Sequence, residues 1–183
     1  PPDYSSAGQM CIRDSSSGMD ISEKQNLDQL SKKLKSFEGK KVDAHSIYLN
    51  RDDSSSEGIK VSSIASDFSI GTITYDDPLE IKKSLERNHS NTWKETDAET
   101  RSNILNRIAD VIDEDPHELI FYLINEAGKT IQNAIDEIRE AVDFLRYYSK
   151  EALKIFNEEK LDGPTGEENN ISYSPKGRFL CIS

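Results

Sequence analysis

Cysteine, tryptophan and long apolar runs are scarce in this 183-residue chain. The cysteines Cys11 and Cys181 lie far apart and have no Cys or His neighbours at metal-ligand spacing, so neither a zinc site nor a disulfide framework is predicted. No window approaches the roughly 18 consecutive apolar residues of a membrane-spanning helix. The start of the chain also lacks the basic and then apolar pattern of a secretory signal. We therefore expect a cytoplasmic protein.

Positive charge is in the minority. The chain has 23 Lys and Arg residues against 34 Asp and Glu residues, which gives a net charge of −11. Basic side chains neutralise phosphates in nucleic-acid complexes, and here they are outnumbered and interleaved with acidic ones. The composition therefore excludes a nucleic-acid binder and disfavours electrostatic attachment to a membrane.

Apolar residues make up only 34% of the chain, and the mean hydropathy is −0.70. Globular domains typically contain about 45–50% apolar residues, counting Gly. The chain also begins with Pro-Pro rather than Met and ends inside an apolar run. We therefore expect a fragment of a larger protein, or a chain that is partly disordered. Residues 1–15 lack any apolar periodicity, and the run at 10–15 (Met-Cys-Ile-Arg-Asp-Ser) resembles a translated sequencing adapter, so we expect 1–15 to be foreign and disordered.

Periodicity predicts helices and a few short strands. Runs of β-branched and aromatic residues predict two or three antiparallel strands at 45–49, 59–64 and 70–75. Apolar residues spaced by threes and fours predict five helices. Three of them are expected at 22–37, at 78–89 and at 130–156. A fourth begins after a cap at Thr96 or Asp97 and ends at Asp115-Pro116, after which the fifth begins. Two last strands are expected at 170–174 and 178–183, joined by 175–177.

The tripeptide Gly128-Lys129-Thr130 invites comparison with a phosphate-binding loop. That motif needs another Gly five residues before its second Gly, and position 123 is Leu. The tripeptide also lies between two predicted helices, whereas a phosphate-binding loop joins a strand to a helix. We therefore expect Gly128 to end a helix, with Lys129 near the negative end of its dipole.

Glu140 is the main candidate for a binding residue. At 100° per residue, Phe144 and Tyr147 fall on the same side of the predicted long helix as Glu140, opposite its aliphatic face. A purely solvated face would not need aromatic residues. Glu140 is therefore either a surface residue paired with a nearby Arg or a carboxylate that lines a pocket.

The histidines and Cys181 are not predicted to form a metal site or a catalytic site. His45, His89 and His117 lie in unrelated elements and form no ligand set, so each is expected at the surface or at a cap. Cys181 lies in a predicted strand between Leu180 and Ile182. A buried, inert thiol is expected there.

Several strings together resemble one family. Trp93, residues 101–110 (Arg-Ser-Asn-Ile-Leu-Asn-Arg-Ile-Ala-Asp) and residues 126–130 (Glu-Ala-Gly-Lys-Thr) resemble the N-terminal helices of the aldehyde dehydrogenase superfamily. The resemblance implies an α/β fold. The chain would be the N-terminal, mostly helical part of the NAD-binding domain, with a few short strands and a Rossmann sheet that only begins at the C-terminus.

Within that superfamily, the chain is similar to the dehydrogenase half of proline utilisation A. The similar strings are 137–148 (Glu-Ile-Arg-Glu-Ala-Val-Asp-Phe-Leu-Arg-Tyr-Tyr), 163–167 (Gly-Pro-Thr-Gly-Glu) and 177–183 (Gly-Arg-Phe-Leu-Cys-Ile-Ser). Residues 16–21 resemble the segment that enters this half. The resemblance implies the division 1–15 foreign, 16–44 linker and helix, and 45–183 truncated NAD-binding domain.

The resemblance also implies the chemistry of the parent enzyme. In this family a cysteine thiolate attacks the aldehyde, hydride passes to NAD, and a glutamate-activated water hydrolyses the thioester. The sequence matches none of those catalytic residues. Glu140 falls at the position that lies beside the amino group of glutamate semialdehyde. Ile182 and Ser183 match the start of the segment that runs along the NAD ribose.

We therefore expect a fragment of an NAD-dependent L-glutamate γ-semialdehyde (1-pyrroline-5-carboxylate) dehydrogenase that is inactive by itself. The parent would act in proline catabolism, form a homo-oligomer, and be fused to an FAD-dependent proline dehydrogenase domain that this chain lacks. A stand-alone dehydrogenase of the same family is one alternative. A non-catalytic, acidic helical interaction module is another.

Overall fold

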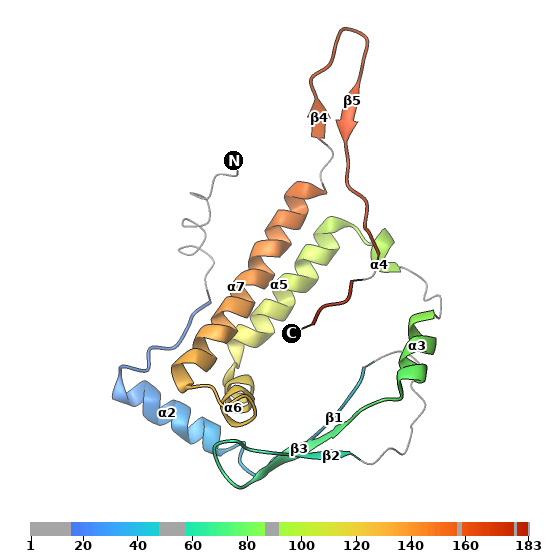
Figure 1. Ribbon diagram of the computed structural model, residues 1–183. Coiled ribbons are helices and arrows are strands. Elements are labelled where there is room, and N and C mark those ends of the chain that lie inside the picture. Colours follow the sequence, from blue (N-terminus) through green and yellow to red (C-terminus); the bar gives the residue numbers. More distant parts are fainter. Residues whose placement is uncertain (1–15, 48–57, 87–91, 157–158, 178, 183) are drawn as a thin grey trace. The chain divides into compact units, whose positions relative to one another are not determined.

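The computed structural model describes residues 16–47, 58–86, 92–156, 159–177 and 179–182 (Figure 1). The expected foreign segment, 1–15, lies outside the described residues. By their contacts, the described residues within 17–89 and 113–140 form one compact unit, the sheet unit. The described residues within 92–112 and 141–182, with Ser16, form another, the helix-pair unit. About half of the described residues are helical. The elements are α2 (Lys24–Lys35), β1 (Val42–His45), β2 (Ile59–Ser62), β3 (Ser69–Thr74), α3 (Pro78–Glu86), α4 (Thr92–Glu95), α5 (Ala98–Glu114), α6 (His117–Asn125), α7 (Ile131–Ile155), β4 (Glu159–Leu161) and β5 (Asn169–Ile171).

A three-stranded sheet with the order β1-β3-β2 lies in the sheet unit. β2 pairs with β3 antiparallel, as predicted, but β1 pairs with β3 in parallel, so the prediction was wrong for β1. β1 also begins at Val42 rather than at His45. Gly71 permits the close pairing, because a Cβ atom there would lie 1.8 Å from the carbonyl oxygen of Val42. Strand direction escapes a sequence pattern because alternation with period two is the same in both directions.

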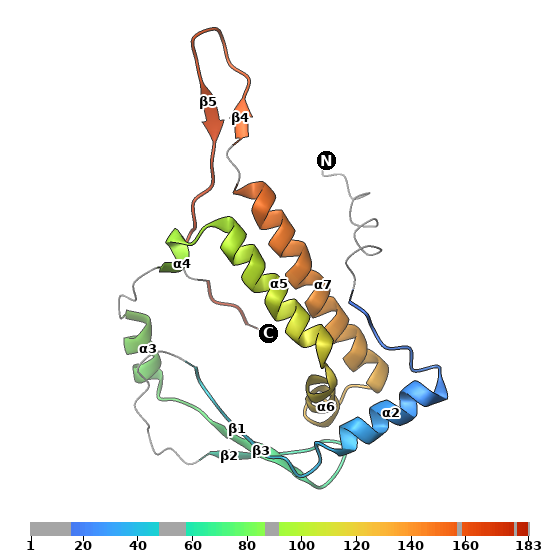
Figure 2. The same cartoon turned by 180° about the vertical axis from the view of Figure 1, so that it is seen from behind.

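Aromatic side chains form the core of the sheet unit. The ring of Phe121 in α6 lies 5.8 Å from that of Phe37 and 5.9 Å from that of Phe68, between centroids. Leu30 of α2 and Ile70 of β3 are also buried. Full burial of one such side chain stabilises the fold by about 1.5–3 kcal/mol. This burial holds α2 against α6 (Figure 2).

Asn125 connects the end of α6 to the loop after β2. Its backbone carbonyl accepts a hydrogen bond from the Ile64 N–H at 2.7 Å, and its side-chain Oδ1 accepts one from the Ser63 hydroxyl at 2.9 Å. Its Nδ2 donates to the carbonyl oxygen of Phe121 at 2.9 Å. Asn125 is buried with these polar atoms paired, so its burial carries little desolvation penalty.

In the helix-pair unit, α5 and the C-terminal half of α7 run side by side (Figures 1 and 2). Ser149 of α7 is fully buried, with its hydroxyl 2.9 Å from Asn106 Oδ1 of α5 and 2.8 Å from the Arg146 carbonyl oxygen. The Arg101 guanidinium lies 4.5 Å from the centroid of the Phe156 ring. The Ser149–Asn106 hydrogen bond thus joins the two helices.

Helix starts agree with the predicted capping residues. The Thr100 N–H and hydroxyl both donate to the Asp97 carboxylate at 2.7 Å, so Asp97 caps α5. These two hydrogen bonds, led by the backbone one, hold the pKa of Asp97 below its usual value. α6 begins directly after Asp115-Pro116, and α7 is a single 25-residue helix, as predicted.

The C-terminal segment differs from the prediction. The strand at 169–171 pairs antiparallel with β4, at 159–161, and not with a strand after residue 177. Residues 179–182 have no strand partner among the described residues, so the expected start of a Rossmann sheet is not found there. Arg178 and Ser183 lie outside the described residues. A strand exists only as one side of a hydrogen-bonded ladder, which a β-like composition alone cannot supply.

Within the described ranges, no helix combines the length and the apolar character needed to cross a membrane.

Candidate functional site

Glu140 lies on the exposed side of α7. The buried side of this helix is formed by Ala134, Ile135, Ile138 and Val142. At 100° per residue, Glu140 points away from all four of them, and its side chain is exposed. The predicted division of this helix into an aliphatic side and a second side that carries Glu140 is therefore confirmed.

Aromatic residues accompany Glu140 on that side. Phe144 is 50% exposed and stacks on Tyr148, with ring centroids 5.9 Å apart. Tyr147 meets Tyr148 edge to face, with centroids 5.1 Å apart. Sequence reasoning missed Tyr148, although its spacing of four residues from Phe144 carried the signal. The exposed rings of Phe144 and Tyr148 and the half-buried ring of Tyr147 thus form an aromatic surface along the same helix as Glu140.

The carboxylate of Glu140 has no hydrogen bond or ion pair with any described residue. The adjacent Arg139 packs beside Gly18 instead, where a Cβ atom would lie 3.1 Å from Arg139 Nε. The other arginine of α7, Arg146, donates to Asp110 Oδ1 at 3.3 Å. The ion pair between Glu140 and a nearby Arg, one of the two sequence alternatives, is thus not found in the described part of the chain.

Gly128-Lys129-Thr130 forms a connection between helices. Gly128 has a φ of +69°, which is typical of the residue after a helix end. The Lys129 N–H donates to the Leu123 carbonyl oxygen at 3.0 Å, and its Nζ pairs with Glu137. The Thr130 hydroxyl accepts a hydrogen bond from the Asn133 N–H at 3.2 Å and so caps α7. The prediction that Gly128 ends a helix is therefore confirmed. The Lys129 and Thr130 groups that a phosphate would need already bind other parts of the chain.

The histidines stay apart from one another. His45 lies exposed in β1, and His117 contacts Asp115 at the start of α6. His89 lies outside the described residues. The described ranges contain no cluster of three or more His, Cys, Asp or Glu side chains that could hold a metal ion.

The residues matched to the NAD segment lie at the end of the chain. Ile182 is 88% exposed, and Ser183 lies outside the described residues. Cys181 is a free, exposed thiol, so the prediction of a buried cysteine was wrong. Burial of this segment needs neighbouring strands, and none of the described residues provides one beside it.

Two curated proteins are similar to parts of the chain. The 1-pyrroline-5-carboxylate dehydrogenase 2 of Halalkalibacterium halodurans is 37% identical over 92 residues, which are 50% of this chain and 18% of that protein. The bifunctional protein PutA of Escherichia coli is 35% identical over 116 residues, which are 62% of this chain and 8% of that protein. The chain therefore spans less than a fifth of the length of either relative.

Solved structures share the fold. Proline utilisation A from Bdellovibrio bacteriovorus superposes with a TM-score of 0.78 at 21% identity, over 87% of this chain and 17% of that one. The 1-pyrroline-5-carboxylate dehydrogenase from Thermus, solved with bound NAD, superposes with a TM-score of 0.67 at 22% identity, over 82% of this chain and 30% of that one. The fold is therefore that of part of an aldehyde dehydrogenase.

A sequence profile described as the aldehyde dehydrogenase family matches residues 51–183, which is more than half of the chain. This match includes α5, α6 and α7 and agrees with the resemblance carried by the strings in these helices. The chain belongs to the aldehyde dehydrogenase family.

Proposed function

We propose that this chain is the N-terminal part of an NAD-dependent L-glutamate γ-semialdehyde (1-pyrroline-5-carboxylate) dehydrogenase in the cytoplasm. Relatives of both kinds, a 1-pyrroline-5-carboxylate dehydrogenase and a PutA, support this substrate class. We also retain the division into 1–15, 16–44 and 45–183 as part of the proposal, with 45–183 as the truncated NAD-binding domain.

The observation that carries the proposal is the free carboxylate of Glu140 beside exposed aromatic rings. Glutamate semialdehyde carries an ammonium group, for which a carboxylate supplies a charge-assisted hydrogen bond. The adjacent rings of Phe144 and Tyr147 provide an apolar wall of the kind that lines small-molecule sites. Glu140 is thus suited to bind this substrate in preference to a neutral aldehyde.

The chain would supply only an edge of the cofactor site. NAD accepts the hydride in this family. Residues 179–182 are exposed and leave their backbone groups unpaired among the described residues, which fits a segment that contacts a ribose through backbone atoms. Ile182, and Ser183 beyond the described part, would form that edge. The nucleophilic Cys and the basic Glu would come from outside this chain.

The first test is turnover by the chain itself. Because the chain matches none of the catalytic residues, we expect no NADH production from pyrroline-5-carboxylate above a boiled control. Activity of the isolated chain would refute its assignment as an inactive part of the enzyme.

The substrate role of Glu140 is tested in the full-length enzyme by Glu140→Gln, which keeps the size of the side chain and removes its charge. Loss of one charge-assisted hydrogen bond should raise the KM for glutamate semialdehyde about tenfold. The KM for pentanal, a neutral aldehyde of matching length, should change less than about twofold, because pentanal has no ammonium group. Equal effects on both substrates would remove the proposed role.

The relation to a proline dehydrogenase domain is also a proposal. Residues 16–21 resemble the segment that enters the dehydrogenase half of proline utilisation A. We therefore expect the coding sequence upstream of Ser16 to encode an FAD-dependent barrel. An initiation codon directly before this segment would instead favour a stand-alone dehydrogenase. By the same resemblance, residues 169–180 would contribute to subunit contacts in a homo-oligomer.

A further inference from the structure

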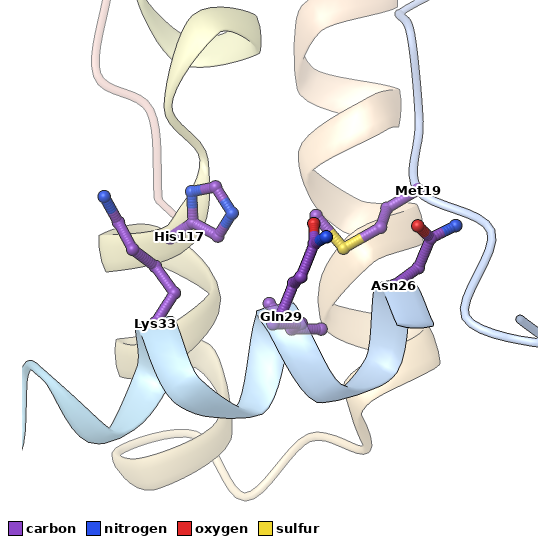
Figure 3. Close-up of a pocket in the computed structure, with 6 residues that line it drawn as sticks. Met19, Asn26, Gln29, Lys33 and His117 are labelled. Carbon is purple, nitrogen blue, oxygen red and sulfur yellow. The ribbon is translucent and has the colours of Figure 1, made fainter. Parts of the chain in front are cut away.

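A cavity lies beside α2 in the sheet unit, away from Glu140. Its volume is about 240 Å³, and the first residue of α6, His117, forms part of its wall (Figure 3). Leu30, which is buried, contributes an apolar floor. The lining residues are Met19, Asn26, Gln29, Leu30, Lys33 and His117. Drug-sized ligands occupy about 300–1,000 Å³, so this cavity is suited to a smaller molecule.

Positive groups gather at one end of the cavity. Figure 3 shows the side chains of Lys33 and His117 close together, one from α2 and the other from α6. The Asp115 carboxylate joins them, with Oδ2 3.6 Å from Lys33 Nζ and Oδ1 hydrogen-bonded to His117 Nδ1. The hydrogen bond from His117 and, less strongly, the charge of Lys33 hold the pKa of Asp115 below its usual value. Asp115 therefore stays ionised at neutral pH and balances one positive charge.

At this end the Lys33 ammonium and the Asp115 carboxylate carry opposite charges, and His117 adds its ring nitrogens. The Asp20 carboxylate, next to Met19, does not line the cavity and accepts hydrogen bonds from the Ser22 N–H at 2.9 Å and the Ser22 hydroxyl at 2.6 Å.

Carboxamide groups line the other end. The Gln29 side chain has no hydrogen bond with any described residue, so its NH₂ and its carbonyl oxygen are both available. Asn26 Nδ2 donates to the Asp20 carbonyl oxygen at 2.8 Å, which leaves Asn26 Oδ1 available as an acceptor. The cavity thus offers cationic donors at one end and neutral hydrogen-bonding groups at the other.

We infer that this cavity binds a small oxyanion, a carboxylate or a phosphate, with its charged group at Lys33 and His117 and its remainder along Gln29. A charge-assisted hydrogen bond from Lys33 and a hydrogen bond from the Gln29 NH₂ group would supply the affinity. Because Lys33 is half exposed, solvent weakens its contribution, and we expect dissociation constants in the millimolar range.

The test is a titration of the 183-residue chain followed by NMR, with acetate and inorganic phosphate as probes at constant ionic strength. We expect saturable shifts of the Asn26 and Gln29 side-chain amide signals. Lys33→Gln should weaken binding at least about fivefold. The matched control is Lys32→Gln, which removes the same charge from the same helix one residue away from the lining and should leave the affinity within about twofold.

The His117 contribution is tested with acetate. His117→Gln should weaken acetate binding several-fold. Acetate and phosphate arms distinguish a carboxylate site from a phosphate site. Equal weakening by Lys32→Gln and Lys33→Gln would indicate diffuse attraction and overturn the inference. The absence of saturable shifts with both probes would also overturn it.

Discussion

Phenylalanine and isoleucine side chains are buried in the sheet unit and exposed in the C-terminal segment 159–182. Phe121 and Ile120 of α6 are 2% and 1% exposed, whereas Phe179 and Ile182 are 76% and 88% exposed. The sheet unit surrounds its apolar residues with α2, α6 and three strands, while the C-terminal segment provides only one short pair of strands. Burial is therefore decided by the available neighbours and not by the residue.

The largest effect should come from the aromatic core. Phe121→Ala removes a ring that contacts Phe37 and Phe68 and should lower the free energy of unfolding by about 3–5 kcal/mol. Phe179→Ala is the matched control and should change it by less than about 0.5 kcal/mol. Urea unfolding followed by circular dichroism measures both. Similar losses would mean that segment 179–182 is packed in solution.

Glycine-to-alanine substitutions compare how tightly the backbone is packed in the sheet unit and in the C-terminal segment. Gly71→Ala brings a Cβ atom against the Val42 carbonyl oxygen and should lower the free energy of unfolding by about 3 kcal/mol. Gly166→Ala has no atom within 4 Å and only a positive φ of +98°, so a loss of about 1 kcal/mol is expected. Amide hydrogen exchange should accelerate in β1 for Gly71→Ala alone. Unchanged exchange in β1 would contradict its pairing with β3.

Acid should destabilise the sheet unit through Asp115. The folded-state pKa of Asp115 is lowered below its unfolded value, so its stabilisation is complete above the unfolded pKa, about 4, and is lost as the pH falls through the folded pKa. Asp115→Asn should reduce this acid-dependent loss. The measurement is the urea midpoint between about pH 5 and about pH 2.

The control for Asp115 is Glu168→Gln in the C-terminal segment. Glu168 pairs with Lys160 at 2.7 Å, but both side chains are at least 70% exposed, and such pairs contribute little. The pH dependence should therefore not change in this variant. If the urea midpoint depends on pH equally in Asp115→Asn and in the unsubstituted chain, other carboxylates cause the loss of stability in acid.

Helices were predictable because their signals are local. The spacing of Ile135, Ile138 and Val142 predicts one face of α7, and Asp97 predicts the start of α5, since a cap bonds within one turn. The second side of α7 with Glu140 and Phe144 follows from the same period. What Glu140 binds does not follow from periodicity, because a pocket needs walls from other elements.

Strand partners were less predictable. β-Branched composition indicates β2 and β3, but nothing in it indicates that β1 lies parallel to β3 or that β5 pairs with β4. The cavity beside α2 also escaped prediction, because Lys33 and His117 are distant in sequence and meet only when α2 packs on α6. Contacts between distant segments leave no local pattern.

The sequence by itself determined the longer helices, the cap of α5 at Asp97 and the resemblance to aldehyde dehydrogenases. Tertiary structure alone decided the direction of β1, the pairing of β5, the exposure of Cys181 and the joint placement of Lys33, Asp115 and His117. The physical reason is the range of the interactions. Helices close their hydrogen bonds within four residues, whereas sheets, cores and cavities depend on groups brought together from far along the chain.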